Sequence, residues 1–353
     1  MSDILQKLES SIESLKNKSS MIYFFVQDTK GNARASIKYT YQMALTLKDA
    51  GYNVSMLHEK KDYFGVQDWL GNIYMEKLPH LSVEGQNLQI APEDTIVIPE
   101  LFGYIMQQIA NLPCAKIVIC QSYDYIFETL QPGQTWAQFG FLKCITTSEE
   151  MKSYISQAMR GISIDVIPPV ISNIFSEQKL PPKPIISIHT REQRDSINII
   201  KAFYVKYPQY RWISFKDMRG ISEQDFASAL KDSMLSVWID DVSSFGTYPL
   251  ESMSCGVPVL GTIPKMVPSW LNENNGIWLQ DSLKIVDIIA DYIQNWLEDN
   301  ISENLIKNGL ETSSRFSNEE NFKNLILNNF ENYQSTRIEM FQEEINKHQE
   351  QKV

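Results

Sequence analysis

The sequence predicts an α/β protein with two doubly wound, parallel sheets, and three observations support this fold class. Short apolar runs of strand length alternate with helical patterns in both halves of the chain, as in sheets with helical crossovers. A polar stretch with three prolines, residues 176–184, separates the halves and is typical of a semi-rigid linker. The 353 residues, 43% of them hydrophobic, are enough for two domains with their own cores.

The first half is predicted to begin with a helix over residues 3–16, where apolar residues recur at helical spacing. A long helix is predicted over residues 33–50, because its pattern stops at Gly51. Ser148 is the expected N-cap of a third helix, residues 151–159. Strands are predicted at residues 21–26, 52–57, 95–98, 115–120, 141–146 and 164–167, with weaker candidates at residues 72–75 and 88–90.

The alternation restarts after the proline-rich stretch. Strands are predicted at residues 185–188, 210–215, 234–239 and 259–260, and helices at residues 194–207 and 223–231. The last part, residues 282–350, is predicted to be helical because it contains few breakers. We therefore place a first domain at residues 1–178, a second at 179–330 and a C-terminal helix at 331–353, with packing back on the first domain as one option.

Composition and charge argue against several classes of protein. A net charge of −11 argues against a general nucleic-acid binder and against electrostatic docking to anionic lipid, since both need basic surface. The sequence has no apolar run of about 18 residues and no signal segment at its start. The four cysteines lack CxxC spacing, which indicates reduced core residues. We expect a cytoplasmic protein, and contact of its first helix with the inner face of a membrane stays open.

The most informative segment is residues 243–259. It joins the strand at residues 234–239 to a Phe245-Gly246 turn and a helix start that carries Glu251. A turn at the carboxyl end of a strand, leading into a helix N-terminus, is where α/β proteins bind anionic ligands. Gly246 lets the backbone approach a ligand closely. Glu251, expected in the first turn of the helix, can accept hydrogen bonds from a ribose diol.

This segment resembles the sugar-nucleotide signature of GT-B-fold retaining glycosyltransferases of the family 4, or group 1, type. The family pattern is Glu-x-Phe-Gly, four further residues, and Glu-Ala-Met-Ala-x-Gly-x-Pro-Val. The matching residues here are Phe245, Gly246, Leu250, Glu251, Met253, Gly256, Pro258 and Val259. The resemblance implies that Glu251 binds the ribose of the nucleotide and that the backbone near Phe245 and Gly246 faces the transferred sugar.

The sequence departs from this signature at one functional position. Ser243 stands where the family has its first Glu, which contacts the donor sugar. Ser243 can form a hydrogen bond but cannot supply the charge, so the resemblance assigns it to donor binding in a weaker form. Asp240 and Asp241 lie just upstream and are candidates to replace the missing carboxylate, although a polar strand end explains them equally well.

Two arginines lie beside the first helix start of the second domain. Arg191 and Arg194 follow the strand at residues 185–188, and guanidinium groups bind phosphate through paired donors. Residues 194–203 are similar to the family's Lys-Gly-x-x-x-Leu-Ile-x-Ala-Phe, which implies that the two arginines stabilise the departing diphosphate. A solvated helix start with Arg–Glu pairs is the alternative. His189, a lone histidine, is interpreted as structural.

Polar residues follow three strands of the first domain. Gly31 and Asn32 lie in the first turn, where the family has a Gly-Gly pair touching the donor phosphate or the acceptor, so the resemblance implies donor binding. Glu100, Gln121 and Ser122 follow two further strands, and carboxyl ends of parallel strands converge on the crevice of the sheet. We predict that these three shape an acceptor pocket, with helix capping as the alternative.

The resemblance covers residues 21 to about 330. It implies two Rossmann-like domains facing a central cleft. It also implies transfer of a sugar from a nucleoside-diphosphate sugar, UDP- or GDP-linked, to a glycan or glycoconjugate acceptor, with retention of configuration, as in polysaccharide biosynthesis. No cofactor is expected besides this substrate, and no metal, because no His or Cys cluster has ligand spacing. A nucleic-acid partner is not expected, and a weak membrane or protein partner stays open.

Two other hypotheses stay open. Three departures from the family favour a catalytically weak or inactive glycosyltransferase-like subunit that binds nucleotide or glycan and supports a partner enzyme. They are the loss of the first Glu at Ser243, of the second glycine beside Gly31, and of a His that family members often carry near Gln121. The helical tail, residues 301–353, would then be its docking element. A nucleotide-sugar epimerase on the same fold would need a pair of carboxylates, for which Glu100, Asp124 and Glu251 are the candidates.

Overall fold

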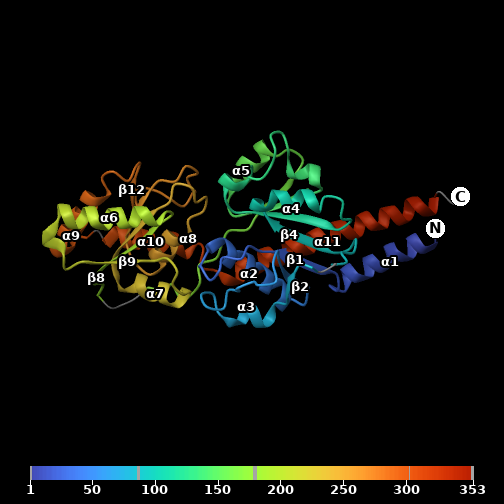
Figure 1. The fold of residues 1–353 in the computed structure, drawn as a ribbon, viewed down its shortest axis with the longest axis horizontal. Coiled ribbons are helices and arrows are strands. Elements are labelled where there is room, and N and C mark those ends of the chain that lie inside the picture. The colour runs from blue at the N-terminus through green and yellow to red at the C-terminus, as the bar shows by residue number, and fades with distance from the viewer. Residues whose placement is uncertain (1, 86–87, 178–180, 302, 351–353) are drawn as a thin grey trace. The chain divides into compact units, whose positions relative to one another are not determined.

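A computed structural model describes residues 2–85, 88–177, 181–301 and 303–350 of the chain and divides it into two compact units (Figure 1). Unit 1 combines Met1–Pro168 with Glu320–Val353, and unit 2 is Pro169–Glu319. The predicted boundary at residues 178–179 lies outside the described residues. The division falls earlier, between Pro168 and Pro169, directly after the last strand of the first sheet.

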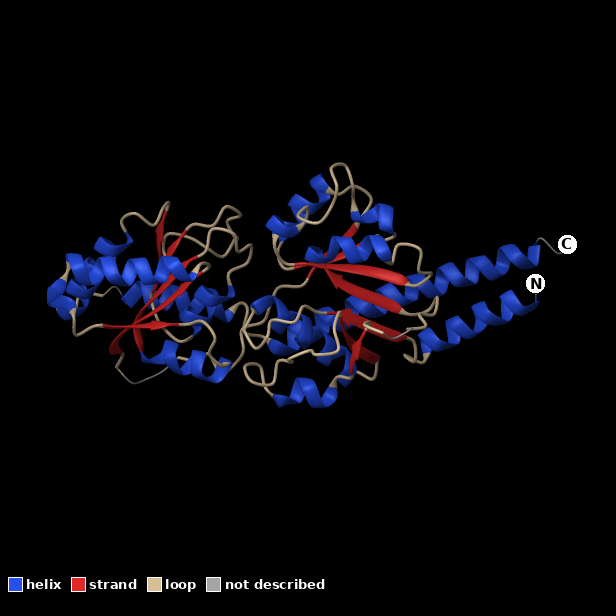
Figure 2. Ribbon diagram, in the orientation of Figure 1, coloured by secondary structure: helices blue, strands red, loops and turns tan. Residues whose placement is uncertain are grey.

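Unit 1 is built on a seven-stranded, entirely parallel sheet with the order β3-β2-β1-β4-β5-β6-β7. Figure 2 shows the strands in red and the helices in blue. Its inner strands are continuous apolar runs, because helices cover both faces of a parallel sheet. The strands are β1 (Met21–Phe25), β2 (Asn53–His58), β3 (His80–Ser82), β4 (Thr95–Pro99), β5 (Ala115–Cys120), β6 (Lys143–Thr146) and β7 (Ser163–Val166). The helices are α1 (Ser2–Lys16), α2 (Ala35–Asp49), α3 (Asn72–Lys77), α4 (Gly103–Gln108), α5 (Glu149–Ala158) and α11 (Glu319–Glu350).

Unit 2 is built on a second parallel sheet, with the order β12-β11-β10-β8-β9. The strands are β8 (Lys183–Thr190), β9 (Ser214–Asp217), β10 (Ser233–Ile239), β11 (Val259–Thr262) and β12 (Ile277–Leu279). The helices are α6 (Gln193–Lys206), α7 (Glu223–Asp232), α8 (Thr247–Ser254), α9 (Ile285–Leu297) and α10 (Glu303–Ser314). One hydrophobic cluster packs α6 and α9 on the sheet, and another packs α7 and α8 on it. Helices therefore cover both faces of this sheet too.

Several details differ from the sequence-based expectations. Residues 72–75 belong to helix α3, not to a strand, since a short apolar run does not distinguish the two. Residues 88–90 form no strand, whereas His80–Ser82 forms one that was not predicted. The prediction of buried cysteines is confirmed, because all four are free and buried. Ser148 caps α5 as predicted, accepting the backbone N–H of Met151 at 3.2 Å.

A buried arginine attaches helix α11 to the rest of unit 1. Arg337 is 7% exposed and donates hydrogen bonds to the carbonyls of Pro92, at 2.6 Å, and Glu93, at 2.8 Å. It also donates to the Thr95 hydroxyl at 3.1 Å. These bonds tie the last helix to the start of β4, which is separated from it by more than two hundred residues of sequence.

Replacing Arg337 by methionine is expected to lower the free energy of unfolding by about 2 kcal/mol. Methionine fills part of the space, but the carbonyls of Pro92 and Glu93 lose a charged donor. Urea unfolding of this variant, compared with Lys323→Met at an exposed position of the same helix, measures the effect. Equal stability of the two variants would show that the buried arginine contributes nothing net.

Candidate functional site

The sheet of unit 2 has a topological switch point between β8 and β10. From β8 the chain crosses to β9 on one side, and from β10 it crosses to β11 on the other. The two strands pair directly, with Thr190 opposite Ile239. Ligands of open α/β sheets bind outside the carboxyl ends of the strands at such a point. The segments that follow β8 and β10 therefore form the candidate site of this unit.

Arg191 lies across these two strand ends. Its backbone N–H donates to the carbonyl of Ile239 at 3.0 Å, and its guanidinium Nη1 lies 3.6 Å from Oδ1 of Asp240. The same carboxylate oxygen accepts the backbone N–H groups of Val242 and Ser243, both at 3.0 Å. Asp240 thus orders the turn after β10, and it brings a cation to the switch point.

Asp240 and Asp241, the candidates for the missing carboxylate, have other contacts. Asp240 is engaged by the turn and by Arg191, as described, while Asp241 is exposed and lies 3.8 Å from Nζ of Lys265. This exposed ion pair between Asp241 and Lys265 is expected to contribute little to stability.

Arg194 is the second residue of α6 and is exposed, so both predicted arginines lie at the N-terminal end of one helix. The helix dipole favours anions at that end.

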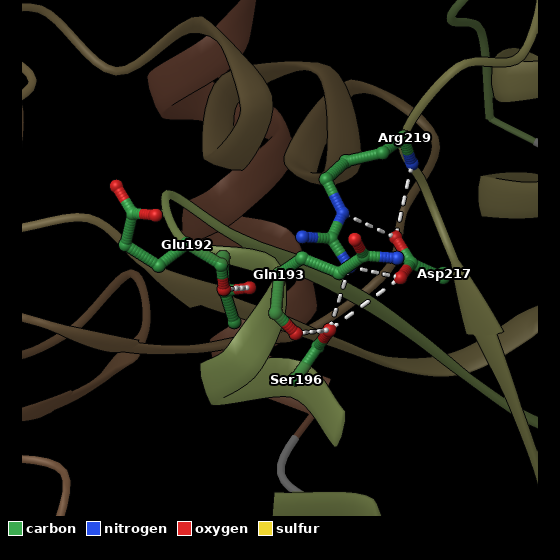
Figure 3. Close-up of polar contacts among 6 residues, drawn as sticks. Glu192, Gln193, Ser196, Asp217 and Arg219 are labelled. Carbon is green, nitrogen blue, oxygen red and sulfur yellow. Dashed lines mark hydrogen bonds and ion pairs between the residues drawn. The ribbon is translucent and has the colours of Figure 1, made fainter. Parts of the chain in front are cut away.

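A polar cluster that the sequence analysis did not include lies beside the first turn of α6 (Figure 3). Arg219 donates to Asp217 through Nε, at 3.0 Å, and through Nη2, which also donates to the Ser196 hydroxyl at 2.8 Å. Ser196 in turn donates to the carbonyl of Gln193 at 3.0 Å. Burial acts to raise the pKa of Asp217, but the hydrogen bonds and charge of Arg219 outweigh it and hold the pKa below its ordinary value.

This cluster connects the end of β9 to the helix that carries the two predicted arginines. An acidic residue at the end of a strand and a basic residue just after it, as Asp217 and Arg219 are at the end of β9, were a signal for it in the sequence. The signal was missed because the strand was predicted at residues 210–215, so that it began at the last residue of the Pro208–Tyr210 turn and ended before Asp217.

His189 lies at the end of β8 and stacks on Tyr248, the second residue of α8, with ring centroids 5.0 Å apart. Burial lowers the pKa of His189, and the nearby Arg219 lowers it too, against the opposing charges of Asp240 and Asp217. A buried, stacked ring agrees with its interpretation as a structural residue.

The turn before α8 is shaped by Gly246. This residue has φ of 75°, in the left-handed region, and a Cβ there would lie 3.1 Å from carbon atoms of both Trp238 and Trp270. Phe245 is buried. Helix α8 begins at Thr247, so Glu251 lies in its second turn rather than in the first, and it is partly exposed. The expected position of Glu251 was wrong by about one turn because the left-handed glycine delays the helix start.

The sheet of unit 1 has its own switch point, between β1 and β4. Gly31 and Asn32 lie in the loop after β1, where Gly31 has φ of 80° and Asn32 donates to the carbonyl of Thr29. A Cβ on Gly31 would lie 2.9 Å from the ring of Phe64. A side chain at residue 31 would therefore be strained. An ordinary tight turn is enough to explain this glycine, so its conformation does not by itself indicate a ligand site.

The structure brings Glu100, Gln121 and Ser122 together at the other side of that switch point. Oε1 of Glu100 accepts the backbone N–H groups of Gln121, at 3.0 Å, and Ser122, at 2.8 Å. The Gln121 side chain donates to the carbonyl of Ser36 at the start of α2. Glu100 is 3% exposed, and burial raises its pKa to about 7 despite the two amide donors. The three residues lie together, as their position at neighbouring strand ends predicts, and their role in acceptor binding stays a prediction.

The described residues were also compared with what a metal site and a membrane span require. No group of three or more His, Cys, Asp or Glu side chains in the described part of the chain comes together as a metal site would require. Across residues 2–350, apart from the undescribed gaps, none of the helices is both long and apolar enough to cross a bilayer.

Neither a protein-family model nor a curated protein matches this sequence. Solved structures do match its fold. Sucrose-phosphate synthase from Thermosynechococcus elongatus aligns with a TM-score of 0.60 and 15% identity, over 90% of this chain and 99% of that one. HepE of Anabaena in complex with UDP-glucose aligns with a TM-score of 0.63 and 13% identity, over 88% and 98%. The pneumococcal O-GlcNAc transferase GtfA, in complex with UDP and GlcNAc, gives 0.62 and 9%, over 91% and 99%.

These neighbours are glycosyltransferases of the GT-B fold, and their alignments extend over nearly the whole chain. With the two parallel, doubly wound sheets, they establish the predicted fold class. At identities of 9–15% the likeness concerns the fold.

Proposed function

We propose that this protein is a glycosyltransferase that uses a nucleoside-diphosphate sugar as donor. The observation that carries the proposal is the switch point of unit 2. There, Arg191 lies between the ends of two adjacent strands and the helices α6 and α8 both begin. Helix N-termini and guanidinium groups together favour a diphosphate. A GT-B fold shared with a protein whose structure holds UDP-glucose supports the choice of ligand.

In this proposal Arg191 and Arg194 stabilise the charge of the departing diphosphate, and Glu251 binds the ribose. Preorganised charge of this kind contributes several kcal/mol to lowering a barrier, about 3 kcal/mol for one well-placed donor. The Asp217–Arg219–Ser196 cluster holds the first turn of α6 in place, so it positions the two arginines. The backbone of Phe245 and Gly246, with Ser243, faces the transferred sugar.

The finer features of the proposal follow the sequence resemblance. Transfer proceeds with retention of configuration, as in family 4 enzymes, and the donor is UDP- or GDP-linked. Glu100, Gln121 and Ser122 bind a glycan or glycoconjugate acceptor, and Gly31 and Asn32 belong to the donor side. The net charge of −11 favours an uncharged acceptor over an anionic one.

Thermal unfolding against UDP-, GDP-, dTDP- and ADP-sugars tests the proposal. A ligand that binds only the folded state stabilises it by RT ln(1 + [L]/Kd), about 2.7 kcal/mol at a hundredfold excess over Kd. We expect a shift with one nucleotide family and then slow hydrolysis of that donor. The absence of a shift with all four would refute donor binding.

Two substitutions are expected to remove most of that thermal shift. Arg194→Met removes a cation from the start of α6, and Glu251→Gln removes the carboxylate proposed for the ribose; each is expected to weaken donor binding about tenfold. Arg211→Met is the matched control. Arg211 is also exposed, but it precedes β9 and therefore lies at the amino ends of the strands, away from the proposed site. Unchanged binding in both test variants would contradict the assignment of these residues.

Ser243 favours a second candidate, a glycosyltransferase-like subunit with little or no activity. The backbone N–H of Ser243 is used in the turn with Asp240, and its hydroxyl supplies no charge at the position where the family has a carboxylate. Binding of a donor without turnover, in the presence of candidate acceptors, would favour this alternative.

A further inference from the structure

The Phe245–Gly246 turn is held from behind by a buried tryptophan. Nε1 of Trp270 donates a hydrogen bond to the carbonyl of Phe245 at 2.8 Å, and Trp270 is 2% exposed. Trp270 lies in the connection between β11 and β12, after the strand that neighbours β10 in the sheet. A residue from another crossover therefore fixes one carbonyl in the middle of the proposed donor site.

This hydrogen bond also sets the direction of the next N–H group. The peptide bond is planar and trans, and no cis bond occurs in the described chain, so the carbonyl of Phe245 and the N–H of Gly246 point in opposite directions. With the carbonyl directed at Trp270, the N–H of Gly246 points away from it. Gly246 itself lies close to two indole rings, since atoms of Trp238 and Trp270 would be 3.1 Å from a Cβ at this residue.

The start of α8 receives no cap from its N-cap residue. This residue is Gly246, which has no side chain to accept a hydrogen bond from the first N–H groups of the helix. Pro249, the third helical residue, has no N–H group, so the donors that an α-helix leaves unsatisfied are here those of Gly246, Thr247 and Tyr248. Gly246 and Tyr248 are buried, and a buried donor without a partner is costly. A ligand oxygen at this point would satisfy them.

We propose that Trp270 is a positioning residue for donor binding, which aims the Gly246 N–H and the uncapped start of α8 at an oxygen of the nucleoside-diphosphate sugar. The inference rests on the proposed function and adds a residue that does not itself touch the donor. Loss of the indole N–H frees the Phe245–Gly246 peptide to rotate and takes the Gly246 donor out of line.

Trp270 is itself fixed by its loop and by α10. Its carbonyl accepts a hydrogen bond from Nδ2 of Asn275, at 2.6 Å, and one from Nδ2 of Asn272, at 3.2 Å. Nδ2 of Asn275 also donates to the Thr312 hydroxyl of α10 at 3.1 Å, and Asn275 is 2% exposed. A continuous set of bonds thus leads from α10 to the turn, so the indole is rigid enough to orient a peptide.

Trp270→Phe tests the proposal, because it keeps an aromatic ring and removes the N–H donor together with part of the indole. The matched control is Trp278→Phe, which likewise loses an indole donor, to Asn272 and Asn275, but has no bond to the turn. We expect Trp270→Phe to weaken binding of UDP-glucose, or of the nucleotide sugar that stabilises the wild type, about tenfold. The control is expected to bind as the wild type, and Trp270→Phe is expected to lose more thermal stability than the control, because Trp270 is buried and Trp278 is partly exposed.

Binding by Trp270→Phe that equals the wild type would overturn the inference, as would an equal loss in both variants. A wild type that binds none of the four nucleotide sugars refutes the proposed function, and amide hydrogen exchange then decides on Trp270 alone. In that case Trp270→Phe must exchange faster than Trp278→Phe at residues 246–248. Equal exchange there refutes the positioning role.

Discussion

Replacing His58 and His80 together by phenylalanine is expected to abolish an acid sensitivity that costs the wild type about 5 kcal/mol of unfolding free energy between pH 7 and pH 4. Both rings are mostly buried in unit 1, and Nε2 of His58 lies 2.7 Å from Nδ1 of His80. His58 also stacks on Tyr63, with ring centroids 3.5 Å apart. The pair therefore has little water to stabilise a charge.

Burial lowers the pKa of His58 to about 3, helped by the charge that His80 would carry, and burial lowers the pKa of His80 to about 4. The unfolded chain binds protons near the ordinary histidine pKa of about 6.5, so it holds more protons than the folded chain below that pH. Stability is therefore fully present above pH 6.5 and falls as the pH drops. A second proton is opposed further, because two imidazolium rings cannot share the hydrogen bond between them.

Urea unfolding of wild type and double variant at intervals between pH 7 and pH 4 measures this effect. The difference in slope is the test, since the substitutions also change packing. His348→Phe near the end of α11 serves as control and should keep the wild-type slope. A double variant as acid-sensitive as the wild type would mean that the pair does not remain neutral in the folded state.

The sequence predicted the α/β architecture because the signals involved are local. Apolar runs such as residues 115–120 identify buried strands, and Ser148 identifies a helix start, whatever the rest of the chain does. The order of strands within each sheet, and so the switch points, depends on contacts between distant segments. The division at Pro168 and the attachment of Arg337 to Pro92 and Glu93 depend on such contacts too.

The positions of the candidate site residues were predicted only in part. The two arginines lie where a strand-to-helix turn places them, since that placement follows from one supersecondary unit. The turn of Glu251 was misjudged because the conformation of Gly246 depends on Trp238 and Trp270 around it. Trp270 itself carried no signal, because a tryptophan in a loop has no periodicity and its partner lies 25 residues away.

Replacing Glu100 by glutamine is expected to raise the free energy of unfolding at pH 8 by about 3 kcal/mol and to leave it unchanged near pH 4. Burial raises the pKa of Glu100 from 4.5 to about 7, so between these values the folded protein binds the proton and the unfolded chain has lost it. Stability from this carboxyl is therefore present below pH 4.5 and is lost as the pH rises through 7. Glutamine keeps an oxygen for the N–H groups of Gln121 and Ser122 and carries no charge to desolvate.

Unfolding at pH 8 and at pH 4, with the exposed Glu128→Gln as control, measures this difference. The slope is opposite in sign to that of the histidine pair, so the Glu100→Gln variant should show the histidine effect alone and grow steadily more stable from pH 4 to pH 7. A buried carboxylate is typical of a functional site rather than of a structural one when its replacement by a neutral isostere stabilises the protein by this much. A loss of stability at pH 8 in Glu100→Gln would instead show that the ionised carboxylate is held by its two amide donors, and that its role at the switch point of unit 1 is to order the Gln121–Ser122 turn.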